Sequence, residues 1–143
     1  MRKLGLDLGT KTCGFAITDE LCIIASGLEN FQYENNDFQQ ILKRIEHYYN
    51  LYESKIDDII LGFPTNARDG SLNERSYLIL DFKKYLEENL KLPLNIILYD
   101  ERFTTKIAKT YLKDQYHIKN SQIKKIKDEI SAVVLLNEYI QYK

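Results

Sequence analysis

The stretch LGLDLGTKTCGFAITD, residues 4–19, decides the fold of this chain. An apolar run over residues 3–8 is followed, after a short polar turn, by a second run over residues 14–19. Two such runs joined by a short turn predict a pair of antiparallel strands. We expect a third strand over residues 22–29, so that the chain opens with a meander of three antiparallel strands.

Beyond this meander, the sequence predicts helices that alternate with strands. Apolar residues recur at every third or fourth position in the expected helices, and short apolar runs mark the expected strands. The expected elements are helices over 37–52, 72–90, 104–113 and from 121 onward, strands over 58–62 and 94–99, and loops over 63–71 and 114–120. This order predicts an α/β fold with a five-stranded mixed sheet, three antiparallel strands followed by two parallel ones, flanked by helices.

The length and composition indicate one globular domain over residues 1–143. Hydrophobic residues make up 44% of the chain and charged residues 29%, which excludes a disordered or fibrous protein. No apolar run approaches the roughly 20 residues of a membrane span, and the early Asp7 argues against a signal peptide. We therefore expect a cytoplasmic protein that does not contact membranes. Cys13 and Cys22 lack the paired spacing of a zinc site, and we expect both to be buried thiols in strands.

The net charge of −1 conceals an uneven distribution of charge along the chain. Between Arg102 and Lys127 there are eight basic residues, and Asp114 is the only acidic one, so that this segment carries about +7. Such a segment favours binding to a polyanion. The alternative is that these lysines only solvate a helical surface.

Three carboxylates stand at positions where acidic residues are unusual or useful. Asp7 lies inside an apolar strand, where an unpaired carboxylate is costly to bury, unless it caps the turn at Gly9. Glu101 follows a strand, at the edge where open sheets bind ligands, although it could instead pair with Arg102 on a loop. Asp128 stands near the start of the last helix, where the helix dipole alone would favour it.

Together these three carboxylates would form a site of hard oxygen ligands. Such a site suits Mg²⁺ or Mn²⁺ and does not suit zinc. Two such ions about 4 Å apart can activate a water and stabilise the leaving oxygen in phosphodiester hydrolysis. The basic segment would then hold the backbone whose phosphates reach the metal ions.

Four blocks of the sequence resemble the motifs of the YqgF/RuvX family. The blocks are LGLDLGTKTCGFAITD at 4–19, LGFP at 61–64 with Gly70, DERFTT at 100–105, and DEISAVVLL at 128–136. They occur in the family's order over nearly the whole chain. The resemblance implies an RNase H-like fold and a nuclease, known in the family both as a Holliday junction resolvase and as the enzyme that matures the 5′ end of 16S ribosomal RNA.

The resemblance also implies the roles of particular residues. The family's catalytic and metal-binding acids fall on Asp7, Glu101 and Asp128. The residues that match the first turn and the third block, and are expected to contact substrate, are Thr10, Lys11, Arg102, Thr104 and Thr105. In the loop over 63–71 and just after it, Asn66, Arg68 and Arg75 are further candidates to touch a phosphate backbone.

We expect the substrate to be precursor 16S rRNA, processed by a monomer or a weak homodimer. A junction resolvase would need a dimer, because two symmetric DNA strands must be cut. A non-catalytic nucleic-acid-binding module of the same fold is a third possibility, although all three acids are present. The turn DLGTKT also resembles the phosphate-binding turn of actin-like ATPases, but those proteins bind ATP between two such domains.

Overall fold

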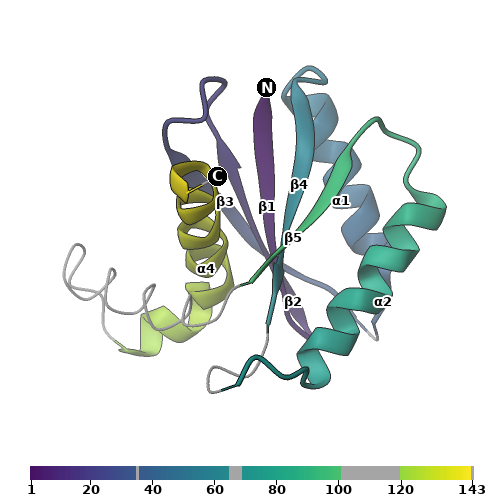
Figure 1. The fold of residues 1–143 in the computed structure, drawn as a ribbon, viewed down its shortest axis with the longest axis vertical. Coiled ribbons are helices and arrows are strands. Elements are labelled where there is room, and N and C mark those ends of the chain that lie inside the picture. Colours follow the sequence, from purple (N-terminus) through teal and green to yellow (C-terminus); the bar gives the residue numbers. More distant parts are fainter. Residues whose placement is uncertain (35, 65–68, 101–119, 143) are drawn as a thin grey trace.

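The computed structural model describes residues 1–34, 36–64, 69–100 and 120–142. For residues 120–128 and 142 it describes the backbone only. Five strands form one sheet in the order β3-β2-β1-β4-β5 (Figure 1). The strands are β1 Arg2–Leu8, β2 Thr12–Thr18, β3 Ala25–Gln32, β4 Ile56–Phe63 and β5 Asn95–Asp100. The first three pair antiparallel, whereas β1 with β4 and β4 with β5 pair parallel. The predicted five-stranded mixed sheet is therefore confirmed.

Three described helices cover the two faces of the sheet (Figure 1). They are α1 Phe38–Leu51, α2 Glu74–Asn89 and α4 Asn120–Tyr142. A side chain caps the amino end of each of the first two: Asp37 accepts the N–H of Gln39, and Asn73 and Ser76 form a capping box. Helices α1 and α2 lie on one face, and α4 packs across β1, β2 and β3 on the other. Within the described part of the chain, no helix has the length and apolarity to span a membrane.

Successive side chains of β1 point to opposite faces of the sheet, and the strand therefore separates two hydrophobic cores. Leu4, Leu6 and Leu8 point into the larger core beneath α1 and α2. Gly5 lies on the opposite face, where Leu136 of α4 comes so close that an added Cβ would meet its Cγ at 2.5 Å. Asp7 has the same parity as Gly5 and therefore belongs to the face that α4 covers.

The third strand was placed too early by the sequence pattern. β3 begins at Ala25, whereas the expected strand began at Cys22. A turn occupies the interval: Oδ1 of Asp19 accepts the N–H groups of Ile23 at 2.6 Å and Ile24 at 3.2 Å. Cys22 sits in this turn with a φ of 55°, so that only Cys13 is the buried strand thiol that we expected. Because the Asp19 carboxylate binds these nearby backbone N–H groups, they do not pair in the sheet, and β3 starts later.

The other predicted elements agree with the structure to within a few residues. β2 begins two residues before the expected strand over 14–19, and β4 begins two residues before the expected strand over 58–62. The expected helix over 104–113 and the loop over 114–120 lie almost entirely outside the described residues.

The topology brings functional positions to one edge of the sheet. Because β1, β4 and β5 are parallel, their carboxyl ends meet at the same edge, where open α/β sheets bind ligands. Helix α4 runs antiparallel to β1, so that its first turns lie at that same edge (Figure 1). The end of β1, the end of β5 and the start of α4 therefore converge.

Candidate active site

Asp7 is a buried carboxylate near the carboxyl end of β1. Its residue is only 2% exposed, and its neighbour in the β1–β2 ladder is Gly14, which carries no side chain beside it. Burying a carboxylate is costly unless a cation or hydrogen-bond donors compensate its charge. The position inside a strand that the sequence predicted for Asp7 is confirmed, and the compensating group can be identified.

Arg75, in the first turn of α2, supplies that compensation. Its Nη2 donates to Oδ1 of Asp7 at 3.0 Å and to the carbonyl oxygen of Leu8 at 2.8 Å. The sequence marked Arg75 only as a candidate for phosphate contact. Its partner lies 68 positions earlier in the chain, and no local pattern links the two residues.

The structure describes only part of the predicted acidic site. Asp128 lies in α4, but the structure does not describe its side chain. Glu101 directly follows the last residue of β5, and the structure does not describe Glu101 at all. The predicted substrate contacts Asn66, Arg68, Arg102, Thr104 and Thr105 also lie outside the described residues.

The backbone nevertheless places Asp128 toward the same edge as Asp7. Leu136 of α4 packs on Gly5, and Asp7 lies two residues beyond Gly5, or about 7 Å along the strand. Going back from Leu136 to Asp128 moves about 12 Å along the helix in the same direction. The two acidic residues therefore stand at the same end of the α4–β1 contact.

Asp7 fits the role of a ligand for a divalent cation. It offers a hard oxygen donor at the ligand-binding edge of the sheet, and Arg75 contacts one of its oxygens, Oδ1. No described residue donates a hydrogen bond to its other oxygen, Oδ2. Elsewhere among the residues that the structure describes, no three His, Cys, Asp or Glu side chains gather as a metal site. A metal centre at this edge would need ligands in addition to Asp7, and Glu101 and Asp128 remain the predicted ones.

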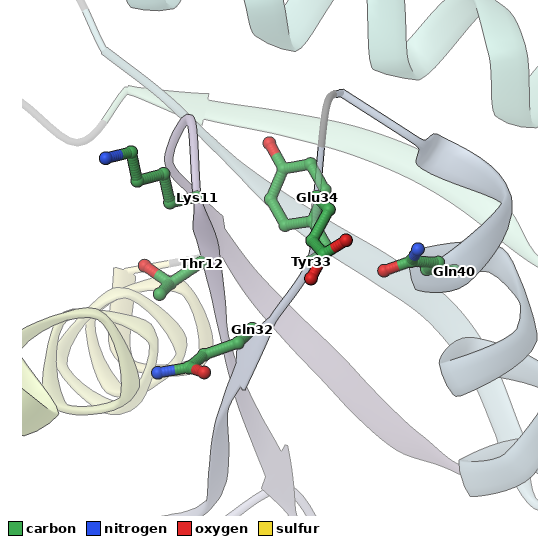
Figure 2. Close-up of a pocket in the computed structure, with 6 residues that line it drawn as sticks. All are labelled: Lys11, Thr12, Gln32, Tyr33, Glu34 and Gln40. Carbon is green, nitrogen blue, oxygen red and sulfur yellow. The ribbon is translucent and has the colours of Figure 1, made fainter.

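The predicted substrate residues Thr10 and Lys11 form the turn between β1 and β2. Both are exposed, and the turn is closed by the N–H of Gly9, which donates to the carbonyl oxygen of Thr12 at 2.7 Å. Tyr33, only 3% exposed, holds the turn from the end of β3: its hydroxyl donates to the carbonyl oxygen of Gly9, and its N–H donates to that of Lys11 at 3.0 Å. The turn is therefore held firmly, and the Lys11 side chain projects from it (Figure 2).

Comparison with proteins of known sequence relates the whole chain to one family. A family model described as RuvX, Holliday junction resolvase, matches residues 1–142. A relative from Ureaplasma parvum named as a pre-16S rRNA nuclease is 53% identical over 142 residues, which cover 98% of this chain and 96% of the relative. A relative of the same name from Geobacillus is 38% identical over 143 residues, covering 100% of this chain and 99% of the relative.

Comparison with solved structures concerns the fold. RuvC from T. thermophilus in complex with a Holliday junction substrate has a TM-score of 0.60 at 14% identity, covering 99% of this chain and 94% of that chain. The fowlpox virus Holliday junction resolvase has a TM-score of 0.58 at 16% identity, covering 100% of both chains. These similarities confirm the RNase H-like fold that the sequence motifs implied. Together with the family model and the curated relatives, they lead to one conclusion: this chain belongs to the RuvX family.

Proposed function

We propose that this chain is a metal-dependent nuclease that hydrolyses a phosphodiester bond in precursor 16S rRNA. The observation that carries the proposal is the buried Asp7 carboxylate at the carboxyl edge of the sheet, toward which the start of α4 and the end of β5 also converge. The names of the relatives at 53% and 38% identity favour precursor 16S rRNA as the substrate.

In this proposal, Asp7, Glu101 and Asp128 would hold Mg²⁺ or Mn²⁺ at the edge of the sheet. Bound there, two ions would lower the pKa of the attacking water and stabilise the leaving oxygen. Lys11, on its braced turn, or Arg102 would offset the negative charge that develops on the phosphate. The basic segment from Arg102 to Lys127 would hold the RNA backbone.

A Holliday junction resolvase is the second candidate function. The description of the matching family model favours it. Cutting two symmetric strands of a DNA junction would require two copies of the chain, whereas trimming a single RNA strand requires one. We propose the RNA substrate because the curated relatives carry that name over nearly their full length.

Cleavage of two labelled substrates by the purified protein tests the proposal. One is a single-stranded RNA that spans the 5′ end of precursor 16S rRNA, and the other is a four-way DNA junction, each with Mn²⁺, Mg²⁺ or EDTA. Asp7→Asn is the inactive variant, and Asp81→Asn, an exposed carboxylate on α2, is the matched control. We expect RNA cleavage that needs metal, disappears in Asp7→Asn and persists in Asp81→Asn. Paired symmetric nicks in the junction alone would favour the resolvase, and metal-dependent cleavage of neither substrate would favour a binding module.

A further inference from the structure

A polar pocket adjoins the turn that carries Lys11. It has a volume of about 770 Å³ and lies between the start of β2, the end of β3 and the start of α1 (Figure 2). The residues that line it are Lys11, Thr12, Gln32, Tyr33, Glu34 and Gln40. In Figure 2, Thr12 and Gln32 lie on one side of the Tyr33 ring and Gln40 on the other. The pocket therefore reaches around the edge of the sheet, from the face of α4 to the face of α1.

The floor of this pocket is fixed before any ligand binds. Tyr33 is buried, and its hydroxyl and N–H bind the carbonyl oxygens of Gly9 and Lys11. Its ring is thus buried within the protein and offers little surface on which a base could stack. A ligand would be recognised here by hydrogen bonds and charge.

Several polar groups of the pocket are available for such recognition. Among the described residues, the side chains of Lys11, Gln32 and Glu34 form no hydrogen bond or ion pair, and solvent reaches all three. The carboxamide of Gln40 donates from Nε2 to Oδ2 of Asp37 at 3.3 Å, which leaves its oxygen to accept from a ligand. The pocket thus presents an ammonium group, carboxamides that both donate and accept, and a carboxylate that only accepts.

The pocket begins close to the proposed catalytic carboxylate. Thr12 and Gln32 are paired across β2 and β3, and both lie on the same face of the sheet as Asp7. Thr12 is one strand across from Asp7 and two residues along, which in a regular ladder corresponds to about 8 Å. Gly14 stands between them without a side chain. This separation is comparable to the length of one nucleotide in an extended strand.

We propose that this pocket binds one nucleotide of single-stranded RNA, next to the phosphodiester bond that is cleaved at Asp7. The inference rests on the proposed function and adds a recognition subsite to it. Lys11 binds the phosphate of that nucleotide. Gln32 and Gln40 bind the base edge or the 2′-hydroxyl, which RNA offers and DNA lacks. Glu34 accepts a hydrogen bond from a base amino group, which gives the site a base preference.

Binding of a fluorescent single-stranded RNA, measured by anisotropy in EDTA, tests the subsite without cleavage. We expect the double variant Gln32→Ala/Gln40→Ala to bind about 4- to 100-fold more weakly than the wild type, since each lost hydrogen bond costs about 2- to 10-fold in affinity. Gln39→Ala, which changes the exposed neighbour of Gln40 outside the pocket, should bind like the wild type. Glu34→Gln should change the ranking of otherwise identical RNAs that differ in one base.

The outcomes separate the subsite from the proposed function. Equal RNA binding by the double variant and the wild type would overturn the subsite, as would equal losses in the double variant and Gln39→Ala. Single-stranded DNA of the same sequence that binds as tightly, with the same dependence on Gln32 and Gln40, would overturn the assignment to RNA. If binding depends on the pocket but metal gives no Asp7-dependent cleavage, the subsite stands and the proposed nuclease activity fails.

Discussion

Arg75 and Asp7 form an ion pair that joins the first turn of α2 to the end of β1. Nη2 of Arg75 lies 3.0 Å from Oδ1 of Asp7, while the same nitrogen donates to the carbonyl oxygen of Leu8. The Asp7 side chain is 3% exposed and that of Arg75 is 38% exposed, so that the pair is buried on its acidic side and reached by water on its basic side. Arg75 thus compensates the carboxylate through Oδ1, and a divalent cation bound by Asp7 would share the same negative charge.

Replacing Arg75 with methionine should destabilise the metal-free protein. The change leaves a buried carboxylate without its cation, which we expect to cost about 1–3 kcal/mol, less than for a fully buried pair because water reaches the guanidinium. Adding Mn²⁺ should recover more stability in Arg75→Met than in the wild type, because the ion no longer competes with Arg75 for Asp7. Thermal unfolding with and without Mn²⁺ measures both effects.

A matched control for this prediction lies on the same helix. Lys83 forms a surface pair with Glu87 at 3.2 Å, and Lys83→Met should change stability by less than about 0.5 kcal/mol, with no dependence on Mn²⁺. A destabilisation of Arg75→Met that Mn²⁺ leaves unchanged would mean that Arg75 only ties α2 to β1. The double variant Asp7→Asn/Arg75→Met should be more stable than Arg75→Met, since it removes the uncompensated charge.

The hydroxyl of Tyr33 should control the rigidity of the turn between β1 and β2. Tyr33→Phe removes the bond to the carbonyl oxygen of Gly9 and keeps the ring, so that we expect a loss of about 1 kcal/mol in the free energy of unfolding. Exchange of the Gly9 amide hydrogen, which closes the turn, should become faster by about 5-fold. Tyr77→Phe, at an exposed tyrosine of α2, should change neither quantity. Unchanged exchange in Tyr33→Phe would contradict a bracing role.

The sequence was most informative where one residue type conflicts with its surroundings. A carboxylate inside the apolar run of β1 predicted the buried Asp7, because few other roles justify the cost of burying it. The helices and the sheet followed from apolar periodicity, since burial of one face drives both kinds of element. The residues alone also marked Asp128, but the helix dipole explained it equally well, and the resemblance to the family favoured a role in the site.

Other features could not be read from local patterns. The start of β3 was misplaced because the carboxylate of Asp19 captures two backbone N–H groups and holds Cys22 in a turn. The contact between Arg75 and Asp7 depends on the mutual position of β1 and α2. The pocket beside Lys11 brings together polar residues from β2, β3, α1 and the adjoining turns, and its exposed residues leave no periodic signal in the sequence.

Lys3 should make the stability of the protein depend on alkaline pH. Its ammonium lies 2.7 Å from Oδ2 of Asp58 and 2.9 Å from Oδ1 of Asp57. Burial alone would lower the pKa of Lys3, but the hydrogen bonds to Asp58 and Asp57 more than reverse this and hold it above its usual value of 10.5. The unfolded chain therefore loses this proton first. The stability contributed by Lys3 is fully present below about pH 10.5 and is lost as pH rises through the folded pKa.

Unfolding of the wild type and Lys3→Met between pH 7 and pH 11.5 measures this dependence. At pH 7 we expect the variant to be less stable by about 2–4 kcal/mol, because Asp58 stays buried without its cation. The difference should be constant up to about pH 10 and shrink above the unfolded pKa. Lys55→Met, which removes an exposed lysine 3.5 Å from Glu20, should cost less than about 1 kcal/mol. A difference that grows above pH 10.5 would contradict the assignment.

The contact between Gly5 and Leu136 should set the position of α4 and, with it, that of Asp128. In Gly5→Ala the new Cβ would meet Cγ of Leu136 at 2.5 Å, and because Leu136 is fully buried and has little room to turn away, we expect α4 to shift. We expect a loss of about 1–3 kcal/mol in unfolding free energy and weaker Mn²⁺ binding, measured by calorimetry.

A second glycine beneath the same helix gives the matched comparison. In Gly27→Ala the new Cβ would meet Oε1 of Glu129 at 2.4 Å, but this is the end of a flexible side chain that can turn away, so that α4 should keep its place. We expect a smaller loss of stability and unchanged Mn²⁺ binding. The double variant Gly5→Ala/Leu136→Ala removes the clash and should regain Mn²⁺ affinity, although the shortened side chain still weakens packing. If Gly5→Ala loses stability but binds Mn²⁺ like the wild type, the contact between Gly5 and Leu136 does not control the metal site.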